Sequence, residues 1–386
     1  MHRSTALWAA GFRPLFAGTL LAAVLLPALW SAFLLGALPL PASLATPPLV
    51  WHAHEMLFGF GGALLGGFLL TASKNWVGIR GIHGRPLVLL AAAWLLQRIL
   101  MAGGSGLPAP VLMLTGSLYT AGMVAWVLAT LWRHRRSDTY GPDNRYFLAA
   151  LPCLVPAQWL VLSADGYAAG VSVAAGIFRL AMLIMLERTL TQFMRAAFGI
   201  ALLRHAVLDH LIKGLALLLV AGHWLPPGVH ASLMLALAAA TSVRWLRWHP
   251  QRAMTRLDIG IMFLAQLGLI AELLLAAAPA VGILLPATAG LHSLTVGGLG
   301  LLAVAMIIRI SRGHTGRPVG FDRLDRAALW LVVAAALLRV AGPALSPGHT
   351  AAWIGLSAAA WTAAFLPLAV RFIPLYLQPR ADGREG

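Results

Sequence analysis

Charged residues are scarce in this sequence. Only 10% of its 386 residues are charged and 60% are apolar, whereas a water-soluble domain carries about a quarter charged residues. The mean hydropathy is +0.82. These values exclude a soluble globular protein, a disordered chain and a collagen-like chain. They favour an all-α polytopic membrane protein over a transmembrane β-barrel, because barrel strands alternate apolar and polar residues.

Cysteine and several well-known motifs are also missing. Cys153 is the single cysteine, which excludes a disulfide framework, a cysteine-ligated zinc site and a cysteine-bound iron–sulfur cluster. The sequence has no Walker A loop, no dinucleotide-binding glycine run, no Ser-His-Asp arrangement and no Cys-x-x-Cys-His site for covalent haem attachment. The chemistry must therefore come from other side chains.

Long apolar runs are abundant. A run of roughly 20 apolar residues is long enough to cross a bilayer as a helix. The sequence predicts a single transmembrane domain, 1–386, with about twelve spans: 15–38, 51–73, 86–103, 110–132, 146–163, 171–188, 203–224, 229–246, 257–279, 289–310, 326–343 and 351–373.

Basic residues gather on one side of these spans. Loops after the even-numbered spans are rich in arginine, whereas loops after the odd-numbered spans contain no lysine or arginine. The positive-inside rule then predicts that both termini lie in the cytoplasm. The net charge of +16 is explained by topology, so we expect no nucleic-acid partner. Four basic residues lie within spans, where charge tends to mark function: Arg98, Arg179, Lys213 and Arg339.

Five histidines are predicted to share one layer near the outer surface: His52, His54, His223, His230 and His292. Neutral imidazole is the commonest metal ligand and a usual axial ligand of haem. Residues two apart on a helix point about 200° from each other, so His52 and His54 cannot ligate one metal from a regular helix. Ordinary interfacial histidines at helix ends are the alternative interpretation.

Glu55 and Glu272 are candidate catalytic carboxylates at the depth of the histidine layer. Intramembrane carboxylates often relay protons, and Glu55 beside His54 could instead orient a ligating imidazole. A structural ion pair with one of the buried arginines is the alternative for Glu272. Arg98 and Arg179 are candidate partners of haem propionates, because arginine matches a carboxylate with two hydrogen bonds.

The second and tenth spans share a weak sequence echo. His54 is followed five residues later by Gly59, and His292 is followed five residues later by Gly297. Both spans are then rich in glycine and end in a basic loop. Glycine allows close approach of a neighbouring helix, which is the commoner reason, or of a flat porphyrin.

Longer motifs carry a resemblance to a known family: Gly11-Phe-Arg-Pro-Leu-Phe16, Trp51-His-Ala-His-Glu-Met-Leu-Phe-Gly-Phe60, Gly67-Phe-Leu-Leu-Thr71, Asn75-Trp76 with Gly78, His292-Ser-Leu-Thr-Val-Gly297 and Arg309-Ile-Ser-Arg-Gly-His-Thr-Gly-Arg-Pro318. With these motifs the sequence resembles the NnrS family over most of its length. The resemblance implies a multi-pass protein of the bacterial inner membrane with twelve helices that holds haem and also copper. It further implies a link to nitric oxide and to denitrification or nitrosative stress.

Two segments depart from the family pattern. The family usually has Gly-Gly-Arg-x-x-Pro-Phe-Phe-Thr where residues 186–194 read Leu-Glu-Arg-Thr-Leu-Thr-Gln-Phe-Met. It often has His-x-Gly-Tyr-x-Trp where residues 258–263 read Asp-Ile-Gly-Ile-Met-Phe. A family histidine is therefore missing at Asp258, and we expect a metal site that uses it to be absent or rebuilt.

The leading hypothesis is a redox enzyme similar to a nitric oxide reductase, embedded in membrane lipid. His54 and His292 are then the predicted axial ligands of a haem, of b type. His52, with His223 or His230, is the candidate site for copper or another second metal, since copper suits imidazole. Protons would pass through Glu55 or Glu272 toward the site, where nitric oxide becomes N2O. A quinol is a candidate electron donor, although no quinone motif is diagnostic.

Two further hypotheses stay open. One is a haem- or nitric-oxide-binding protein without turnover, acting in the nitrosative stress response with the same ligands but without a proton path. The other is a transporter, which predicts polar sites near the midplane on broken helices. A transporter should hold no stoichiometric haem.

Overall fold

The computed structural model describes residues 6–383 of the chain, and residues 1–5 and 384–386 lie outside the described part. Within this part every regular element is a helix and no strand occurs, which confirms the predicted all-α class. Twelve helical segments are long and apolar enough to cross a membrane, as the apolar runs predict. The chain is thus a multi-pass membrane protein.

Each of these segments overlaps one predicted span. The first six are α2 (Phe12–Leu34), α3 (Pro48–His54) with η2 (Glu55–Gly61) and α4 (Gly62–Val77), α5 (Arg85–Gly103), α6 (Ala109–Arg133), α7 (Gly141–Ala150) with η3 (Leu151–Cys153) and α8 (Leu154–Leu162), and α9 (Tyr167–Phe198). The last six are α10 (Ala206–Leu218) with η4 (Leu219–Trp224), α11 (Pro227–Arg247), α13 (Leu257–Ala277) with η5 (Ala278–Val281), α14 (Ala289–His292) with η6 (Ser293–Gly300) and α15 (Leu301–His314), α16 (Arg323–Leu345), and η7 (Pro347–His349) with α17 (Thr350–Tyr376). The short α12 (Pro250–Met254) lies between α11 and α13.

Local sequence explains where several of these helices begin and end. Proline occupies the first turn of α3, α5, α6 and α11, where its missing N–H leaves no hydrogen bond unmade. Gly78 follows α4 with φ +71°, the left-handed conformation that ends many helices. Helix α9 ends at Phe198, ten residues past the predicted end at 188. Within this extension the Thr189 and Thr191 hydroxyls donate to the carbonyls four residues earlier, which satisfies both hydroxyl groups inside the helix.

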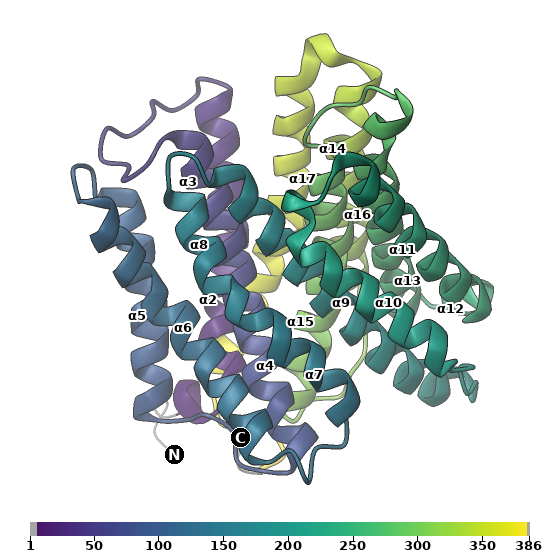
Figure 1. Ribbon diagram of the computed structural model, residues 1–386. Helices are drawn as coiled ribbons and strands as arrows, with labels where there is room; N and C mark the ends of the chain where they lie inside the picture. Colours follow the sequence, from purple (N-terminus) through teal and green to yellow (C-terminus); the bar gives the residue numbers. More distant parts are fainter. Residues whose placement is uncertain (1–5, 384–386) are drawn as a thin grey trace. The chain divides into compact units, whose positions relative to one another are not determined.

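The chain forms two compact units. Among the described residues, the first contains 6–174, Ile307–Gly320 and 365–383, and the second contains Ala175–Met306 and Phe321–Ala364. In the first unit, α5 packs beside α6 and α6 beside α8 (Figure 1). Helices α2 and α4 approach closely at Gly67, where an added Cβ would lie 2.7 Å from the Phe16 ring.

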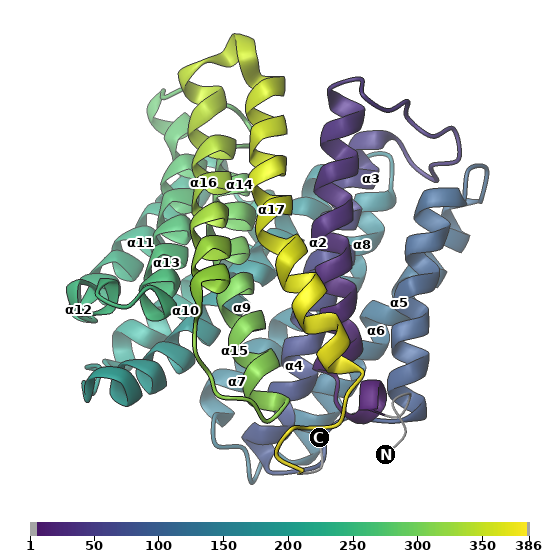
Figure 2. The same cartoon turned by 180° about the vertical axis from the view of Figure 1, so that it is seen from behind.

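The two ends of the described chain meet within the first unit. Arg13 Nη1 donates to the carbonyl of Tyr376 at 3.0 Å and to that of Gln378 at 2.7 Å. The start of α2 and the end of α17 therefore lie at the same end of this unit (Figure 2), as an even number of spans requires. That this end faces the cytoplasm stays a prediction.

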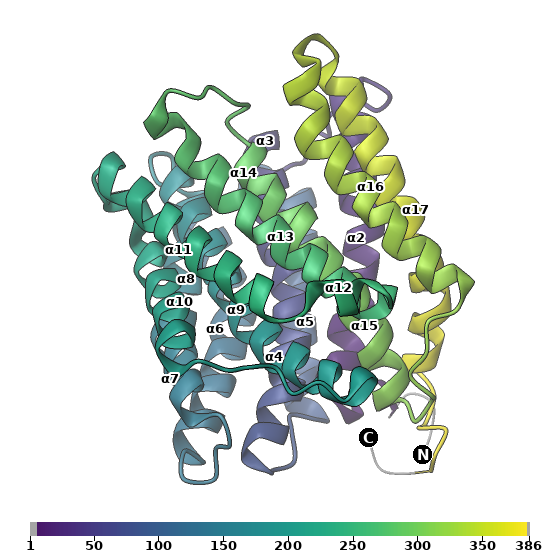
Figure 3. The same cartoon turned by 90° about the vertical axis from the view of Figure 1, so that its right-hand side faces the viewer.

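The second unit is held together by α13, which packs against α11 and η6 (Figure 3). Ser293 Oγ donates to the Gly268 carbonyl at 2.9 Å. A Cβ on Gly268 would lie 2.5 Å from the backbone of Gly297, so glycine on α13 lets the two backbones touch.

Two spans contain π-helical turns, and both turns follow a histidine directly. The turn η2 begins at Glu55, next to His54, and η6 begins at Ser293, next to His292. A π-helical turn widens the helix and frees backbone groups, and such turns are frequent at functional sites. The sequence echo between these spans thus corresponds to a shared backbone feature.

Candidate functional site

The imidazole of His54 is fully buried and is held by its neighbour Glu55 in the first unit. His54 Nδ1 lies 3.0 Å from Glu55 Oε1, and the two side chains are 0% and 3% exposed. An ionised carboxylate can only accept a hydrogen bond, so Nδ1 carries the proton and Nε2 carries a lone pair. Metal-ligating histidines commonly have this arrangement of a carboxylate behind the ring.

Two glutamine amides face that lone pair. Gln97 Nε2 on α5 lies 2.9 Å from His54 Nε2, and Gln158 Nε2 on α8 lies 3.2 Å from it. Gln158 Nε2 also donates to Gln97 Oε1 at 2.9 Å, and Thr120 Oγ1 on α6 donates to Gln158 Oε1 at 2.8 Å. All four side chains are buried. They form one directed network that ends on the imidazole.

Arg98 lies on the other side of Glu55. Its Nε is 3.3 Å from Glu55 Oε2, and its guanidinium packs over the Trp94 ring at 5.7 Å from the centroid. A Cβ on Gly59 would overlap Arg98 Nη1, so glycine in η2 makes room for the guanidinium. Arg98 Nη1 and Nη2 are buried and have no hydrogen-bond partner among residues 6–383. This is a place suited to an anionic oxygen group.

His52 faces different neighbours from His54. Its ring stacks on Trp30, with centroids 4.4 Å apart and planes 14° apart. His52 and His54 thus have different neighbours, as their spacing of two residues on a helix predicts.

His292 repeats the arrangement of His54 in the second unit. Its Nδ1 lies 2.8 Å from the Thr288 carbonyl oxygen, and Arg339 Nη2 on α16 lies 3.0 Å from its Nε2. A carbonyl only accepts and a guanidinium only donates, so His292 also carries its proton on Nδ1. The cap on its lone pair is a cation instead of an amide.

Glu272 and Arg179 form a buried ion pair between α13 and α9. Arg179 donates to both carboxylate oxygens, at 2.9 Å from Nε and 2.6 Å from Nη2. This is the ion-pair alternative predicted for Glu272. The Arg179 fork is occupied by this carboxylate, although its Nη1 finds no hydrogen-bond partner within the described chain.

The other two predicted metal ligands lie near the end of α10 and in α11. His223 is exposed and its ring is 5.5 Å from that of Trp224. His230 packs on Gly222, where a Cβ would lie 2.9 Å from its Nε2. Within residues 6–383, no three histidine, cysteine, aspartate or glutamate side chains are arranged to hold a metal ion. The second metal site stays a prediction, as does the pairing of His54 with His292, which belong to different units.

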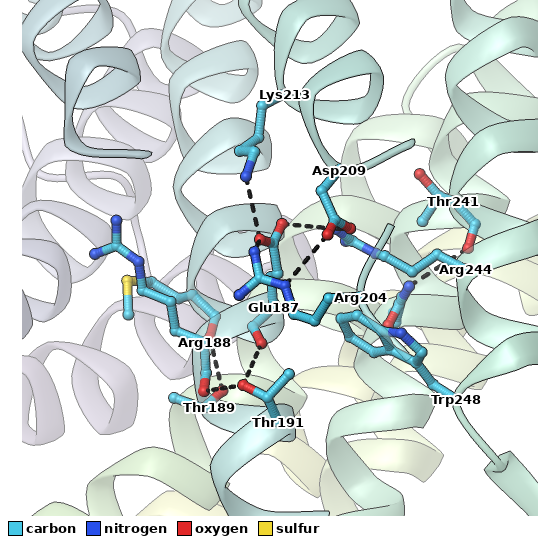
Figure 4. Close-up of polar contacts among 12 residues, drawn as sticks. Glu187, Arg188, Thr189, Thr191, Arg204, Asp209, Lys213, Thr241, Arg244 and Trp248 are labelled. Atoms are coloured by element: carbon cyan, nitrogen blue, oxygen red, sulfur yellow. Dashed lines mark hydrogen bonds and ion pairs between the residues drawn. The ribbon is translucent and has the colours of Figure 1, made fainter. Parts of the chain in front are cut away.

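A separate network of charges surrounds Glu187 in the second unit (Figure 4). Lys213 Nζ and Arg244 Nη1 each lie 3.1 Å from a Glu187 oxygen, and Arg204 also contacts this carboxylate. Arg204 Nε lies 3.2 Å from Asp209 Oδ2. Three helices, α9, α10 and α11, contribute to the network. It therefore joins these helices through buried charges.

Sequence reasoning found His54, Glu55 and Arg98 but missed Gln97, Gln158 and Thr120. Gln97 and Gln158 are each the only amide side chain in their predicted spans, 86–103 and 146–163. The single amide side chain in each of these apolar spans was the available signal.

A family model described as NnrS protein matches residues 6–380, nearly the whole chain. A comparison with curated proteins finds no match.

Proposed function

Because the chain belongs to the NnrS family and contains twelve helices able to cross a membrane, we propose that it is a haem protein of the bacterial inner membrane that reduces nitric oxide. Family membership suggests a membrane protein related to haem and nitric oxide. Reduction to N2O is our more specific proposal.

The observation that carries this proposal is the state of His54. Glu55 holds the proton on Nδ1, so Nε2 presents a lone pair inside the protein. The unmatched N–H groups of Arg98 lie on the other side of the same carboxylate. Glu55 thus contacts both an imidazole with a lone pair and a guanidinium with two unbonded nitrogens. These groups fit a haem, since His54 would hold its iron and Arg98 would bind a propionate.

In this proposal haem, when bound, supplies one-electron chemistry and an iron that binds nitric oxide. Two molecules of nitric oxide, two electrons and two protons give N2O and water. A membrane quinol is the proposed source of the electrons. Glu55 orients His54 and is the proposed carboxylate through which protons reach the site. His292, in the second unit, is the other histidine that we propose would hold haem.

The proposed roles of Arg179 in propionate binding and of the remaining histidines in metal binding have weaker support. Glu272 occupies the Arg179 fork, so we propose Arg98 as the main partner of a propionate. His52, His223 and His230 are kept as proposed ligands of copper or another second metal.

A protein that binds haem and nitric oxide without turnover is the second candidate. The contacts of the two candidate carboxylates favour it. Glu272 is paired with Arg179, and Glu55 contacts both His54 and Arg98. A carboxylate fixed between cations or donors is a poor carrier of protons. This candidate needs the same ligands but no proton path.

The test is a reduced-minus-oxidised visible spectrum of protein purified from haem-sufficient cells, with iron and copper analysis. We expect a split haem spectrum with at least one iron per chain, and at least tenfold less haem in H54A. The exposed His349 supplies the control H349A, which should keep its haem. Anaerobic nitric oxide with quinol should then yield N2O. Haem binding without N2O would support the second candidate. A flat, metal-free sample would contradict both and favour transport.

A further inference from the structure

We infer that Gln97 caps the unprotonated nitrogen of His54 and thereby controls whether that imidazole can take a ligand. The inference rests on the proposed function only for the identity of the ligand. It names a positioning residue that the sequence did not single out.

The hydrogen-bond directions fix which atom of Gln97 faces the ring. Because Glu55 accepts from Nδ1, Nε2 of His54 must accept, and only the NH2 end of an amide can donate to it. Gln97 then presents its oxygen to the Gln158 NH2 at 2.9 Å. Thr120 donates to the Gln158 oxygen at 2.8 Å. A reversed Gln97 amide would set two acceptors against each other.

The fold reserves space for this amide. A Cβ on Gly116 of α6 would overlap Gln97 Nε2 and would lie 2.8 Å from Gln97 Cδ and 3.1 Å from Gln158 Nε2. Both glutamine side chains are at most 2% exposed. The amide is therefore held against the imidazole by packing as well as by its hydrogen bonds.

The corresponding cap at His292 has a different chemistry. Arg339 donates to Nε2 of His292 at 3.0 Å, and a guanidinium keeps its positive charge in proteins. A metal cation at His292 would meet this charge. The Gln97 amide is neutral, and it turns away from His54 at the cost of its hydrogen bonds to His54 and Gln158. The cap on His54 therefore opens more readily than the cap on His292, and Gln97 is the residue that moves.

The expected effect follows from competition. A ligand that binds His54 Nε2 must displace the Gln97 N–H. Losing an ordinary hydrogen bond of this kind lowers the affinity for the ligand a few-fold. Replacing Gln97 with leucine keeps the side chain buried and removes the donor. We expect Q97L to bind ferric haem (hemin) about three- to tenfold more tightly than the unchanged protein. A residue with a merely structural role would give weaker binding when replaced.

The experiment titrates purified, haem-depleted full-length protein with hemin. The variants are Q97L, the double variant Q97L/Q158L, in which the second amide cannot take over, and the control Q266L. Gln266 is also fully buried but bonds to the Thr241 carbonyl at 3.5 Å, with no histidine partner. Q97L or the double variant should gain affinity and Q266L should not. Unchanged or weaker binding in both would overturn the inference.

A second readout does not depend on haem. In 15N-histidine-labelled protein, the signal of the unprotonated His54 nitrogen, assigned with H54N, should move away from the protonated range when its hydrogen bond is lost. We expect this shift in the double variant and not in Q266L. If the unchanged protein binds no hemin, the proposed function is contradicted. The nitrogen signal still tests whether the glutamine amide donates to His54 Nε2. An unmoved His54 signal would overturn the inference.

Discussion

Glu187 is a fully buried carboxylate surrounded by cations. Its side chain is 1% exposed, as are those of Lys213 and Arg244, which both contact it. Removing one partner of a buried charge network leaves other charges unpaired, at a cost of about 3–5 kcal/mol. We expect E187Q to lower the free energy of unfolding in detergent by about this amount.

The control for Glu187 is an exposed pair. The Arg256 side chain is 49% exposed in its pair with Asp258, and such pairs contribute about 0–1 kcal/mol. R256Q should change stability by less than 1 kcal/mol. Equal effects of E187Q and R256Q, measured by thermal or denaturant unfolding, would contradict the buried network.

The Arg179–Glu272 pair can be tested by removing one charge or both. We expect E272Q to cost about 3–5 kcal/mol, because it leaves the Arg179 guanidinium buried and unpaired. The double variant R179M/E272Q should regain more than half of this loss, because no unpaired charge remains. Both variants should keep hemin affinity, since we propose Arg98 as the main propionate partner. A double variant less stable than E272Q would argue against the pair.

Among the elements, the π-helical turn η2 depends on glycine where Arg98 crosses it. A Cβ on Gly59 would overlap Arg98 Nη1, and the Gly59 carbonyl accepts from the Trp94 indole at 3.0 Å. We expect G59A to cost about 1–3 kcal/mol by overpacking and to weaken hemin binding by moving the guanidinium.

Helix α10 offers the matched control for Gly59. Gly214 lies inside α10, and no atom lies within 4 Å of a Cβ placed there. Alanine in such a position stabilises a helix by roughly 0.5–1 kcal/mol. G214A should therefore be neutral or stabilising in the same unfolding assay. A G59A protein as stable as G214A would show that η2 can accept a side chain.

The echo between the second and tenth spans was visible in the sequence, but the π-helical turns were not. The five-residue spacing from His54 to Gly59 and from His292 to Gly297 marked both places. A π-helical turn is stabilised by partners for the backbone groups that it frees. In η2 the Gly59 carbonyl accepts from the Trp94 indole on α5 as well as from the Gly62 N–H, and a local pattern cannot reveal a contact made by another helix.

For the whole molecule, topology is the prediction to test. The positive-inside rule places the loop after α5 outside and the loop after α6 in the cytoplasm. In a C153S background, a cysteine at the exposed Ser105 should react with an impermeant maleimide in intact cells. A cysteine at the exposed Ser137 should react only after the cells are opened. The opposite pattern would reverse the topology.

The sequence by itself determined the membrane class, the twelve spans and the histidine and arginine candidates. It could do so because a bilayer demands long apolar runs and makes each charge within them conspicuous. Tertiary structure alone decided the partners of those candidates. His54 meets Gln97 and Gln158 from 43 and 104 residues away, and Arg179 meets Glu272 from 93 residues away. Such contacts depend on how each helix is rotated against its neighbours, which packing sets and local pattern does not.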